Sequence, residues 1–291
     1  MHNNLGYDKD LFILPFDHRS TFLKLLNVID RSPTNEELNK VKEFKNIIYE
    51  AFKKSLLKIP KEKAAILVDE QFGDSILKDA VTQGFITILT TEKSGQKEFT
   101  FEYGDEFAKH IEKYKPKFAK ALIRYKPQNP LESKKIQQKK LKQLCDFCHS
   151  NGYKFLLEVL IFETGIATSE PMCKVIKELQ DASVEPDVWK MEGMENKLDY
   201  ETVINQIQKD GRENVGLVVL GRGGDEQAVE KWIKESAKVK GVIGFAVGRT
   251  FFQNPLLGYK NGTLNKEQAV EKISNKFIYF YNVFVNGRVK E

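Results

Sequence analysis

Two kinds of segment alternate along the whole chain: short apolar segments and longer amphipathic ones. Each apolar segment is rich in Ile, Leu, Val or Phe and is too short for a typical helix, which indicates a strand. The predicted strands cover residues 11–16, 64–69, 85–89, 118–125, 155–161, 188–192, 216–221 and 242–248. Such continuous apolar composition is typical of parallel strands that are covered on both faces.

Helical spacing of apolar residues fills the intervals between these strands. In residues 36–57, apolar side chains recur every three or four positions, and Thr34 with Glu37 forms a predicted capping box before them. The other predicted helices cover about 74–83, 105–114, 131–150, 170–183, 200–210, 226–238 and 266–284. Strands that are each followed by a helix, eight times over, predict an α/β fold of the (β/α)8 TIM-barrel type.

Chain length and composition favour one domain over two. A chain of 291 residues is close to the roughly 250 residues of one such barrel, and no Ser/Gly-rich linker or shift in composition divides residues 1–291. An open doubly wound sheet is the alternative. That fold places a glycine-rich nucleotide loop after its first strand, whereas residues 15–20 (Pro-Phe-Asp-His-Arg-Ser) contain no glycine.

Charge and composition restrict the partners. The 46 Lys and Arg residues exceed the 41 Asp and Glu residues by a scattered excess of +5, which argues against nucleic acid and mildly favours an anionic small substrate. No apolar stretch approaches the roughly 20 residues that span a bilayer. Residues 1–10 are polar and lack the pattern of a secretory signal. Together with only three cysteines, these features predict a cytoplasmic protein without a membrane segment.

Neither cysteine nor histidine is arranged for a metal or redox site. Cys145 and Cys148 form a C-x-x-C motif inside a lysine-rich helical pattern, without a second pair, so they are predicted to be core-facing helix residues one turn apart. The four histidines lie far apart in the sequence, which argues against a histidine-bound metal. The sequence therefore predicts no metal and no cofactor.

Polar side chains interrupt the apolar strands near their carboxyl ends, where barrels of this type place their reacting groups. These residues are Asp17, Asp69, Glu70, Lys120, Arg124, Glu158, Lys190 and Glu192. Because side chains alternate along a strand, Lys190 and Glu192 share one face while Trp189 and Met191 point toward the helices. The same alternation places Glu158 on the inner face.

Two lysines and several carboxylates are thus expected to point into an otherwise aliphatic barrel. Lys120, Leu122 and Arg124 share the inner face of the fourth strand, and Lys190 faces inward from the sixth. Buried charges must pair or shift their pKa values, so one interpretation is a set of ion pairs that merely fill the barrel. The other is a Schiff-base site, because a lysine beside a second cation and an apolar wall keeps some neutral amine, which can attack a carbonyl.

The last two strands end in glycine and arginine. Residues 220–225 (Leu-Gly-Arg-Gly-Gly-Asp) and 246–250 (Ala-Val-Gly-Arg-Thr) each bring both residue types to a strand end before a helix. Loops after strands seven and eight of such barrels often hold phosphate. The candidate phosphate-binding residues are therefore Arg222, Gly223, Gly224, Gly248 and Arg249. Simple turn geometry is the alternative for either loop taken alone.

Four segments together carry a resemblance to a known family. They are residues 12–20 (Phe-Ile-Leu-Pro-Phe-Asp-His-Arg-Ser), 66–73 (Ile-Leu-Val-Asp-Glu-Gln-Phe-Gly), 186–192 (Pro-Asp-Val-Trp-Lys-Met-Glu) and 244–250 (Gly-Phe-Ala-Val-Gly-Arg-Thr). The chain resembles, from about residue 10 to 285, the aldolase-like domain fused C-terminally to some bacterial 5-dehydro-2-deoxygluconokinases of inositol catabolism. It is more distantly similar to tagatose-1,6-bisphosphate aldolase and the sulfofructose-phosphate aldolases.

This resemblance implies a class I aldolase, a TIM barrel that forms a covalent imine without a metal. Matched to the family motifs, Lys190 is the Schiff-base lysine and Glu158 the proton-transfer residue. Lys120 corresponds to a lysine that lowers the pKa of the nucleophile and holds a substrate oxygen. Asp17 corresponds to an aspartate that binds hydroxyls or assists proton transfer, and Arg249 matches the phosphate loop.

Some expectations stay open. Asp69 is a candidate for substrate binding, whereas Arg222 departs from the small residues of the tagatose group at the end of strand seven. His18 is either a site residue or a helix-capping side chain. Residues 277–281 (Phe-Ile-Tyr-Phe-Tyr) are expected to pack mainly on the barrel, with a subunit contact in a homo-oligomer as the alternative.

The kinase-fused relatives point to a phosphorylated sugar substrate like 2-deoxy-5-keto-gluconate 6-phosphate, cleaved to dihydroxyacetone phosphate and malonate semialdehyde. Fructose 1,6-bisphosphate or tagatose 1,6-bisphosphate is the alternative substrate. A function of another class is a barrel that binds a sugar phosphate without turning it over. The lysine pair with Glu158 argues against this, because a binding site does not need an amine in an apolar pocket.

Overall fold

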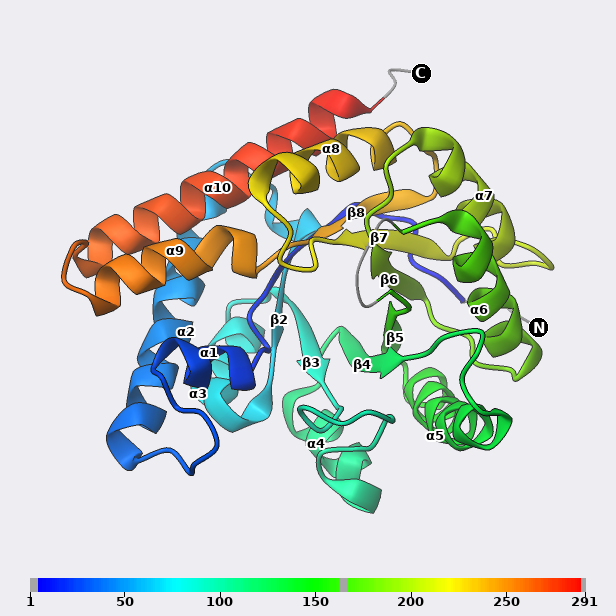
Figure 1. The fold of residues 1–291 in the computed structure, drawn as a ribbon, viewed down its shortest axis with the longest axis horizontal. Coiled ribbons are helices and arrows are strands. Elements are labelled where there is room, and N and C mark those ends of the chain that lie inside the picture. Colours follow the sequence, from blue (N-terminus) through cyan, green and yellow to red (C-terminus); the bar gives the residue numbers. More distant parts are fainter. Residues whose placement is uncertain (1–4, 163–166, 289–291) are drawn as a thin grey trace.

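Eight parallel strands form a closed barrel in the computed structural model, which describes residues 5–162 and 167–288 (Figure 1). Neighbours in the chain are neighbours in the barrel, and β8 closes the sheet against β1. The strands are β1 (Leu11–Pro15), β2 (Ala64–Val68), β3 (Ile86–Thr90), β4 (Phe118–Arg124), β5 (Lys154–Leu160), β6 (Val188–Glu192), β7 (Gly216–Leu220) and β8 (Val242–Ala246). The predicted (β/α)8 barrel is confirmed, and the open sheet is excluded.

Helices surround the strands, with α8, α9 and α10 along one side and α5, α6 and α7 along another (Figure 1). Their bounds are α1 (Ser20–Leu25), α2 (Asn35–Ser55), α3 (Glu70–Thr82), α4 (Phe107–Tyr114), α5 (Leu131–Ser150), α6 (Ser169–Asp181), α7 (Lys197–Ile207), α8 (Glu226–Ser236), α9 (Arg249–Lys260) and α10 (Lys266–Gly287). Short 3-10 turns occupy Lys61–Lys63 and Gly104–Glu106. The predicted capping box of Thr34 and Glu37 is present.

Helices α1 and α9 were not predicted. Six residues make α1 too short for a recognisable apolar period. Helix α9 contains Pro255, which is usually taken as a helix stop, and it begins inside the segment that was interpreted as a phosphate loop. Both helices lie next to the carboxyl end of β1 or β8, so they frame the same end of the barrel.

Two apolar layers hold the fold together. The larger one lies between strands and helices and contains Trp189 and Met191, as the alternation in β6 predicts. Cys145 and Cys148 are buried in this layer on α5, which agrees with their interpretation as core residues. The inner layer fills the barrel itself and consists of Leu11, Ile13, Ala65, Leu67, Ile88, Phe118, Leu156, Val188, Val218, Ile243 and Ala246.

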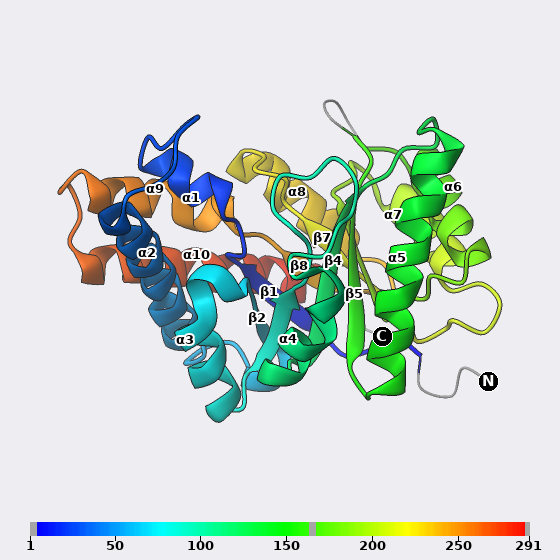
Figure 2. The ribbon, with the colours of Figure 1, turned by 90° about the horizontal axis from the view of Figure 1, so that it is seen from below.

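The chain before β1 closes the amino end of the barrel. Tyr7 packs its ring edge-on against Phe118, with centroids 5.1 Å apart, and the Gly6 N–H donates to Asp187 Oδ1 at 2.9 Å. Figure 2 shows this segment entering at one end, whereas the loop between β3 and α4 lies with α1 at the other end. An apolar floor therefore underlies whatever the carboxyl ends of the strands hold.

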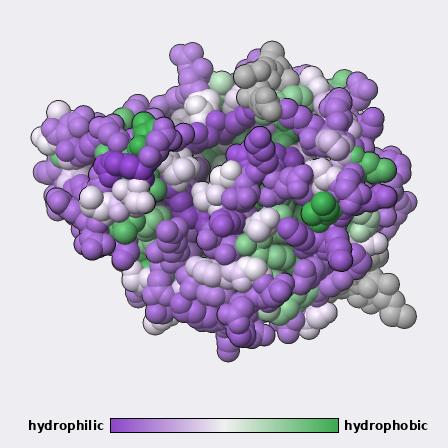
Figure 3. All heavy atoms as spheres, turned by 60° about the horizontal axis from the view of Figure 1, so that its bottom comes forward, coloured by the Kyte–Doolittle hydropathy of each residue, from purple (hydrophilic) through white to green (hydrophobic). Residues whose placement is uncertain are grey.

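The surface carries only scattered apolar residues. The face in Figure 3 is mostly hydrophilic, with hydrophobic residues in small groups. Leu57, Leu131 and Leu198 are the most exposed large apolar side chains of the described residues, and they belong to separate elements. Across the same residues, no helix combines the length and apolar character that crossing a membrane requires.

Candidate active site

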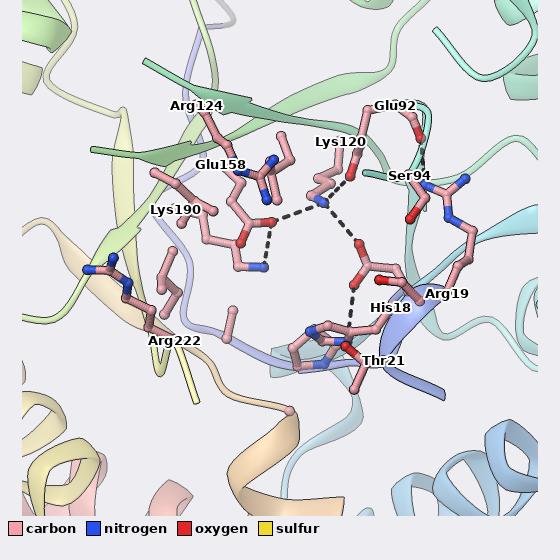
Figure 4. Close-up of a pocket in the computed structure, with 18 of the residues that line it drawn as sticks. His18, Arg19, Thr21, Glu92, Ser94, Lys120, Arg124, Glu158, Lys190 and Arg222 are labelled. Carbon is pink, nitrogen blue, oxygen red and sulfur yellow. Dashed lines mark hydrogen bonds and ion pairs between the residues drawn. The ribbon is translucent and has the colours of Figure 1, made fainter. Parts of the chain in front are cut away.

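A cavity of about 270 Å³ opens at the carboxyl ends of the strands. Its lining comes from β4, β5 and β6, from the segment after β1 and from the loops that follow β3, β7 and β8. Figure 4 shows the polar side chains of this lining converging on Lys120 and Lys190. This is the end at which barrels of this type carry their active sites.

Lys190 and Glu158 form an ion pair at the base of the cavity. The two residues are register partners on β5 and β6, so their inward side chains lie side by side. Lys190 Nζ is 2.9 Å from Glu158 Oε2, and the side chains are only 5% and 10% exposed. Both residues line the cavity, so the pair borders open space as well as the core.

Lys120 lies at the centre of a larger cluster of charges. Its Nζ is 2.9 Å from Asp17 Oδ2, 2.5 Å from Glu92 Oε1 and 3.0 Å from Glu158 Oε2. Thr90, the register partner of Lys120 on β3, donates a hydrogen bond to Asp17 Oδ2 at 2.9 Å. Carboxyl groups from three different strand ends therefore meet on one buried ammonium group (Figure 4).

Burial and pairing act against each other in this cluster. Burial opposes the charge of Lys120, but Asp17, Glu158 and Glu92 outweigh it and raise the pKa of Lys120 well above its usual value. Burial alone would raise the pKa of Asp17 and of Glu158. The neighbouring ammonium groups, Lys120 first, outweigh burial and hold both pKa values below their usual range. Lys120, Asp17 and Glu158 are thus charged at neutral pH.

The cavity also contains two residues that the sequence analysis did not select, Glu92 and Arg19. Arg19 Nη1 donates to Glu102 at 2.5 Å, and its Nη2 donates to the Glu92 carbonyl oxygen at 2.6 Å. Glu92 lies two positions beyond Thr90, the last residue of β3, so it keeps the inward parity of that strand. Following the parity past the predicted strand end would have identified it.

The loops after β7 and β8 form the opposite wall. Arg222, Gly223, Gly248 and Arg249 all line the cavity. Thr250 Oγ1 donates to the Gly224 carbonyl oxygen at 3.2 Å, which joins the two loops. Gly248 precedes α9 and must be small, because a Cβ there would lie 2.2 Å from the Pro15 carbonyl oxygen. The start of α9 and two guanidinium groups make this wall suitable for an anion.

Gly224 lies outside the cavity lining, and its N–H donates to the Gly221 carbonyl oxygen at 2.8 Å. The turn after β7 therefore uses the donor that was expected to hold phosphate. Gly223 adopts a left-handed φ of +73° and lies against the Arg249 guanidinium, so glycine is required there.

Asp69 lies outside the cavity lining. Strand β2 ends at Val68, and the Asp69 side chain turns to cap α3 by accepting a hydrogen bond from the Phe72 N–H at 2.9 Å. Its other oxygen pairs with the fully buried Lys45, which also donates to the Phe16 carbonyl oxygen at 2.7 Å. Asp69 does not line the cavity and acts as a structural residue behind β1.

His18 lies in the cavity and does not cap a helix. Arg19 occupies the N-cap position of α1, without a side-chain cap. The His18 ring packs edge-on against Phe252 at 5.9 Å, and its Nδ1 lies 3.9 Å from Asp17 Oδ1. Burial lowers the pKa of His18 to about 4 in spite of Asp17, so the imidazole is neutral at pH 7.

Residues 3–287 match the profile of a family described as an uncharacterized protein conserved in bacteria (DUF2090). The match spans nearly the whole chain. The chain belongs to this family. No curated protein sequence matches it.

The fold of this DUF2090 chain is similar to that of solved structures, two of which follow. Fructose-bisphosphate aldolase from Plasmodium falciparum, in complex with TRAP and a small-molecule inhibitor, is 15% identical with a TM-score of 0.67, over 99% of this chain and 93% of that chain. The protein Cgl0159 from Corynebacterium glutamicum is 16% identical with a TM-score of 0.59, over 94% and 87%. At these identities the likeness concerns the fold, which is an aldolase-like barrel.

Proposed function

We propose that this DUF2090 barrel is a class I aldolase that cleaves a phosphorylated ketose or keto-sugar acid through a Schiff base on Lys190. The observation that carries the proposal is the buried Lys190 amine beside the cavity, 2.9 Å from Glu158 and one carboxylate away from Lys120. An amine with an adjacent base is the arrangement that covalent catalysis on a carbonyl requires. The aldolase-like fold and the resemblance of the Lys190 and Asp17 segments support the same reaction.

The proposed reaction begins when Lys190 passes a proton to Glu158 and attacks the ketone carbon of the substrate. Glu158 returns this proton to the carbinolamine hydroxyl group, which leaves as water, so an iminium ion and the Glu158 carboxylate result. Glu158 then accepts the proton of the hydroxyl group on the carbon beyond the bond that breaks. The electrons of that C–C bond move to the iminium, which forms an enamine while the hydroxyl carbon leaves as an aldehyde. Glu158 gives its proton to the enamine carbon, and hydrolysis of the resulting iminium ion releases dihydroxyacetone phosphate and restores Lys190.

The surroundings of the pair have separate tasks in this scheme. Lys120 is the donor to the substrate oxygen that develops charge, and Asp17 holds Lys120 and binds a hydroxyl group. The phosphate binds between Arg222 and Arg249 at the start of α9. The resemblance favours 2-deoxy-5-keto-gluconate 6-phosphate as substrate, with fructose or tagatose 1,6-bisphosphate as alternatives. A coupled assay for dihydroxyacetone phosphate over a panel of phosphorylated ketoses and keto acids distinguishes them.

Borohydride trapping tests the proposal directly. Wild-type protein incubated with dihydroxyacetone phosphate and borohydride should gain the mass of one reduced adduct, located on Lys190 by peptide mapping. Lys190→Met should gain none, whereas Lys93→Met, which changes an exposed lysine of the same cavity, should still be labelled. An unchanged mass of the wild type, or an adduct on another lysine, would contradict the proposal. Binding of sugar phosphate without adduct or product would identify a non-catalytic barrel instead.

A further inference from the structure

One wall of the cavity holds buried polar atoms that have no hydrogen-bond partner. Among the described residues, the atoms in this condition include His18 Nδ1, Arg19 Nε and Glu92 Oε2, and all three residues line the cavity. In Figure 4 Glu92 and Arg19 lie to one side of Lys120, whereas Lys190 and Arg222 lie to the other side. Buried polar groups are almost always paired, so three such atoms beside one cavity indicate a place where a ligand supplies the partners.

Glu92 differs from the other two carboxyl groups of the cluster in how it is compensated. Asp17 also accepts a hydrogen bond from Thr90, and Glu158 also pairs with Lys190. Glu92 meets Lys120 with Oε1 alone, and its Oε2 is buried and unpartnered. Arg19 is the other cation beside Glu92, but its Nη1 donates a hydrogen bond to Glu102 and its Nη2 donates one to the Glu92 carbonyl oxygen.

The charge balance of the cluster leaves one carboxyl group in excess. Arg19 is paired with Glu102, so two ammonium groups, Lys120 and Lys190, remain for three carboxyls: Asp17, Glu158 and Glu92. A third negative charge in this buried place would share these two counter-ions, and burying an uncompensated charge costs several kcal/mol. A proton on the least compensated oxygen removes that penalty and turns Oε2 from a bare acceptor into a donor.

We propose that Glu92 is kept as a neutral carboxylic acid whose Oε2–H donates a hydrogen bond to an oxygen on the substrate half that leaves as the aldehyde. This makes Glu92 a specificity-determining residue, and the assignment of the substrate half rests on the proposed aldolase function. Strand β3 stands four places from β7 in the eight-stranded ring, so Glu92 faces the phosphate wall across the barrel. A substrate held by phosphate there and by its carbonyl on Lys190 extends its other end toward Glu92.

The electrostatics of Glu92 agree with the geometry. Burial is the main cause that raises the pKa of Glu92, the negative Asp17 adds to it, and Lys120 and Arg19 oppose it without reversing it. Glu158 and Lys190, on the far side of Lys120, are the remaining charged groups of the cluster. The pKa values of Asp17 and Glu158 are instead lowered, because the neighbouring lysines outweigh burial. Three similar side chains on one ammonium group therefore divide into two bases and one acid.

Infrared difference spectroscopy tests the proton without any use of activity. At pH 7 the wild type should show a carboxylic-acid C=O band that is lost in Glu92→Gln and in Glu92→Ala, either of which serves for the subtraction. Glu98→Gln changes an exposed carboxyl of the same loop and should leave the band unchanged. A wild-type spectrum without any band that depends on Glu92 would overturn the proposal.

The role in specificity is tested in the direction of synthesis, with dihydroxyacetone phosphate as donor. Glu92→Ala should lower kcat/KM for glyceraldehyde by roughly 10-fold or more, because one hydrogen bond is lost, and should change that for unsubstituted propionaldehyde by less than about 3-fold. Glu92→Gln, which keeps an N–H donor, should retain most of the preference. An equal loss with both aldehydes overturns the role. If the wild type forms no adduct on Lys190, the aldolase proposal fails, and the infrared result still decides the proton.

Discussion

A single oxygen, Oε2 of Glu158, serves two lysines: it lies 2.9 Å from Lys190 Nζ and 3.0 Å from Lys120 Nζ. In the proposed reaction this carboxylate takes a proton from Lys190 during imine formation, and it is then the base of the cleavage step. A neutral replacement therefore tests how far each of the two steps depends on Glu158.

Glu158→Gln should lose cleavage while an adduct on Lys190 can still be trapped. The adduct accumulates over the whole incubation with borohydride, so even a slower imine formation should be recorded, whereas each turnover needs the Glu158 base. Turnover should fall about 10²- to 10⁴-fold, the usual contribution of a general base. The measurements are adduct yield by mass and the rate of dihydroxyacetone phosphate release. Turnover within about 3-fold of the wild type would show that another group is the base.

Strand parity carried most of what the sequence could say about single residues. Lys190, Glu158 and Lys120 have the inward placement that alternation predicts, because the strands keep a period of two up to their carboxyl ends. Glu92 was missed because the third predicted strand was ended too early. The contacts of Asp69 could not be predicted, because inward pointing and helix capping are both compatible with an acidic residue after a strand, and its buried partner Lys45 comes from a distant helix.

At the scale of elements, two helices begin with the same kind of N-cap residue, and the surroundings of that residue determine how much it stabilises the protein. Asp69 caps α3 and Asp225 caps α8, each accepting a hydrogen bond from the N–H three residues on. Asp225 is exposed, whereas Asp69 is buried and also neutralises Lys45. Asp225 therefore contributes only a helix cap, whereas Asp69 contributes a helix cap and also neutralises the buried Lys45 behind β1.

Asp69→Ala should destabilise the protein by about 3–5 kcal/mol, because it leaves the Lys45 ammonium buried without a counter-ion. Asp225→Ala should lower the free energy of unfolding by only about 1 kcal/mol, the usual value of an N-cap. Urea unfolding at pH 7 measures both. Equal effects of the two substitutions would mean that Lys45 has little influence on stability.

Helix boundaries were predicted less well than strand parity. Helices α2 and α5 were found because a long amphipathic period, and for α2 a capping box, defines them locally. Helix α9 carries Pro255 in its interior and is fixed by its packing: the Phe251 ring of this helix packs at a tilt against Phe277 and Phe280 of α10. Contacts between elements far apart in the chain, which override local signals, cannot be read from spacing alone.

At the scale of the whole molecule, the closed barrel follows from counting strands and helices, but its lower closure does not. Asp187, fully buried before β6, accepts hydrogen bonds from the N–H groups of Gly6 and Phe155 and pairs with Lys154 and His149. It thereby joins the segment before β1, the start of β5 and the end of α5. The sequence shows Asp187 only as a polar residue ahead of a strand, so this role was not predicted.

The pairing of His149 with Asp187 should make the free energy of unfolding fall as the pH rises into the alkaline range. The hydrogen bond to Asp187, together with one to Cys145, raises the pKa of His149 to about 10. A raised folded-state pKa stabilises fully below the unfolded value of roughly 6.5, and the effect is lost as pH rises toward 10. The free energy of unfolding should therefore decline between pH 7 and 10 in the wild type, and less in His149→Gln. Parallel declines in urea titrations would show that His149 does not cause the effect.

The apolar residues inside the barrel also determine where substrate enters and products leave. Because Phe118, Val188 and their neighbours fill the amino end of the described barrel, the substrate and both products must pass through the cavity opening at the carboxyl end. In the proposed reaction the piece tethered to Lys190 sits innermost, so the untethered aldehyde has to depart first. Product inhibition should show this order of release: dihydroxyacetone phosphate should be a competitive inhibitor against the substrate, and the aldehyde a mixed one. The reverse pattern would mean that the shape of the cavity does not set the order of product release.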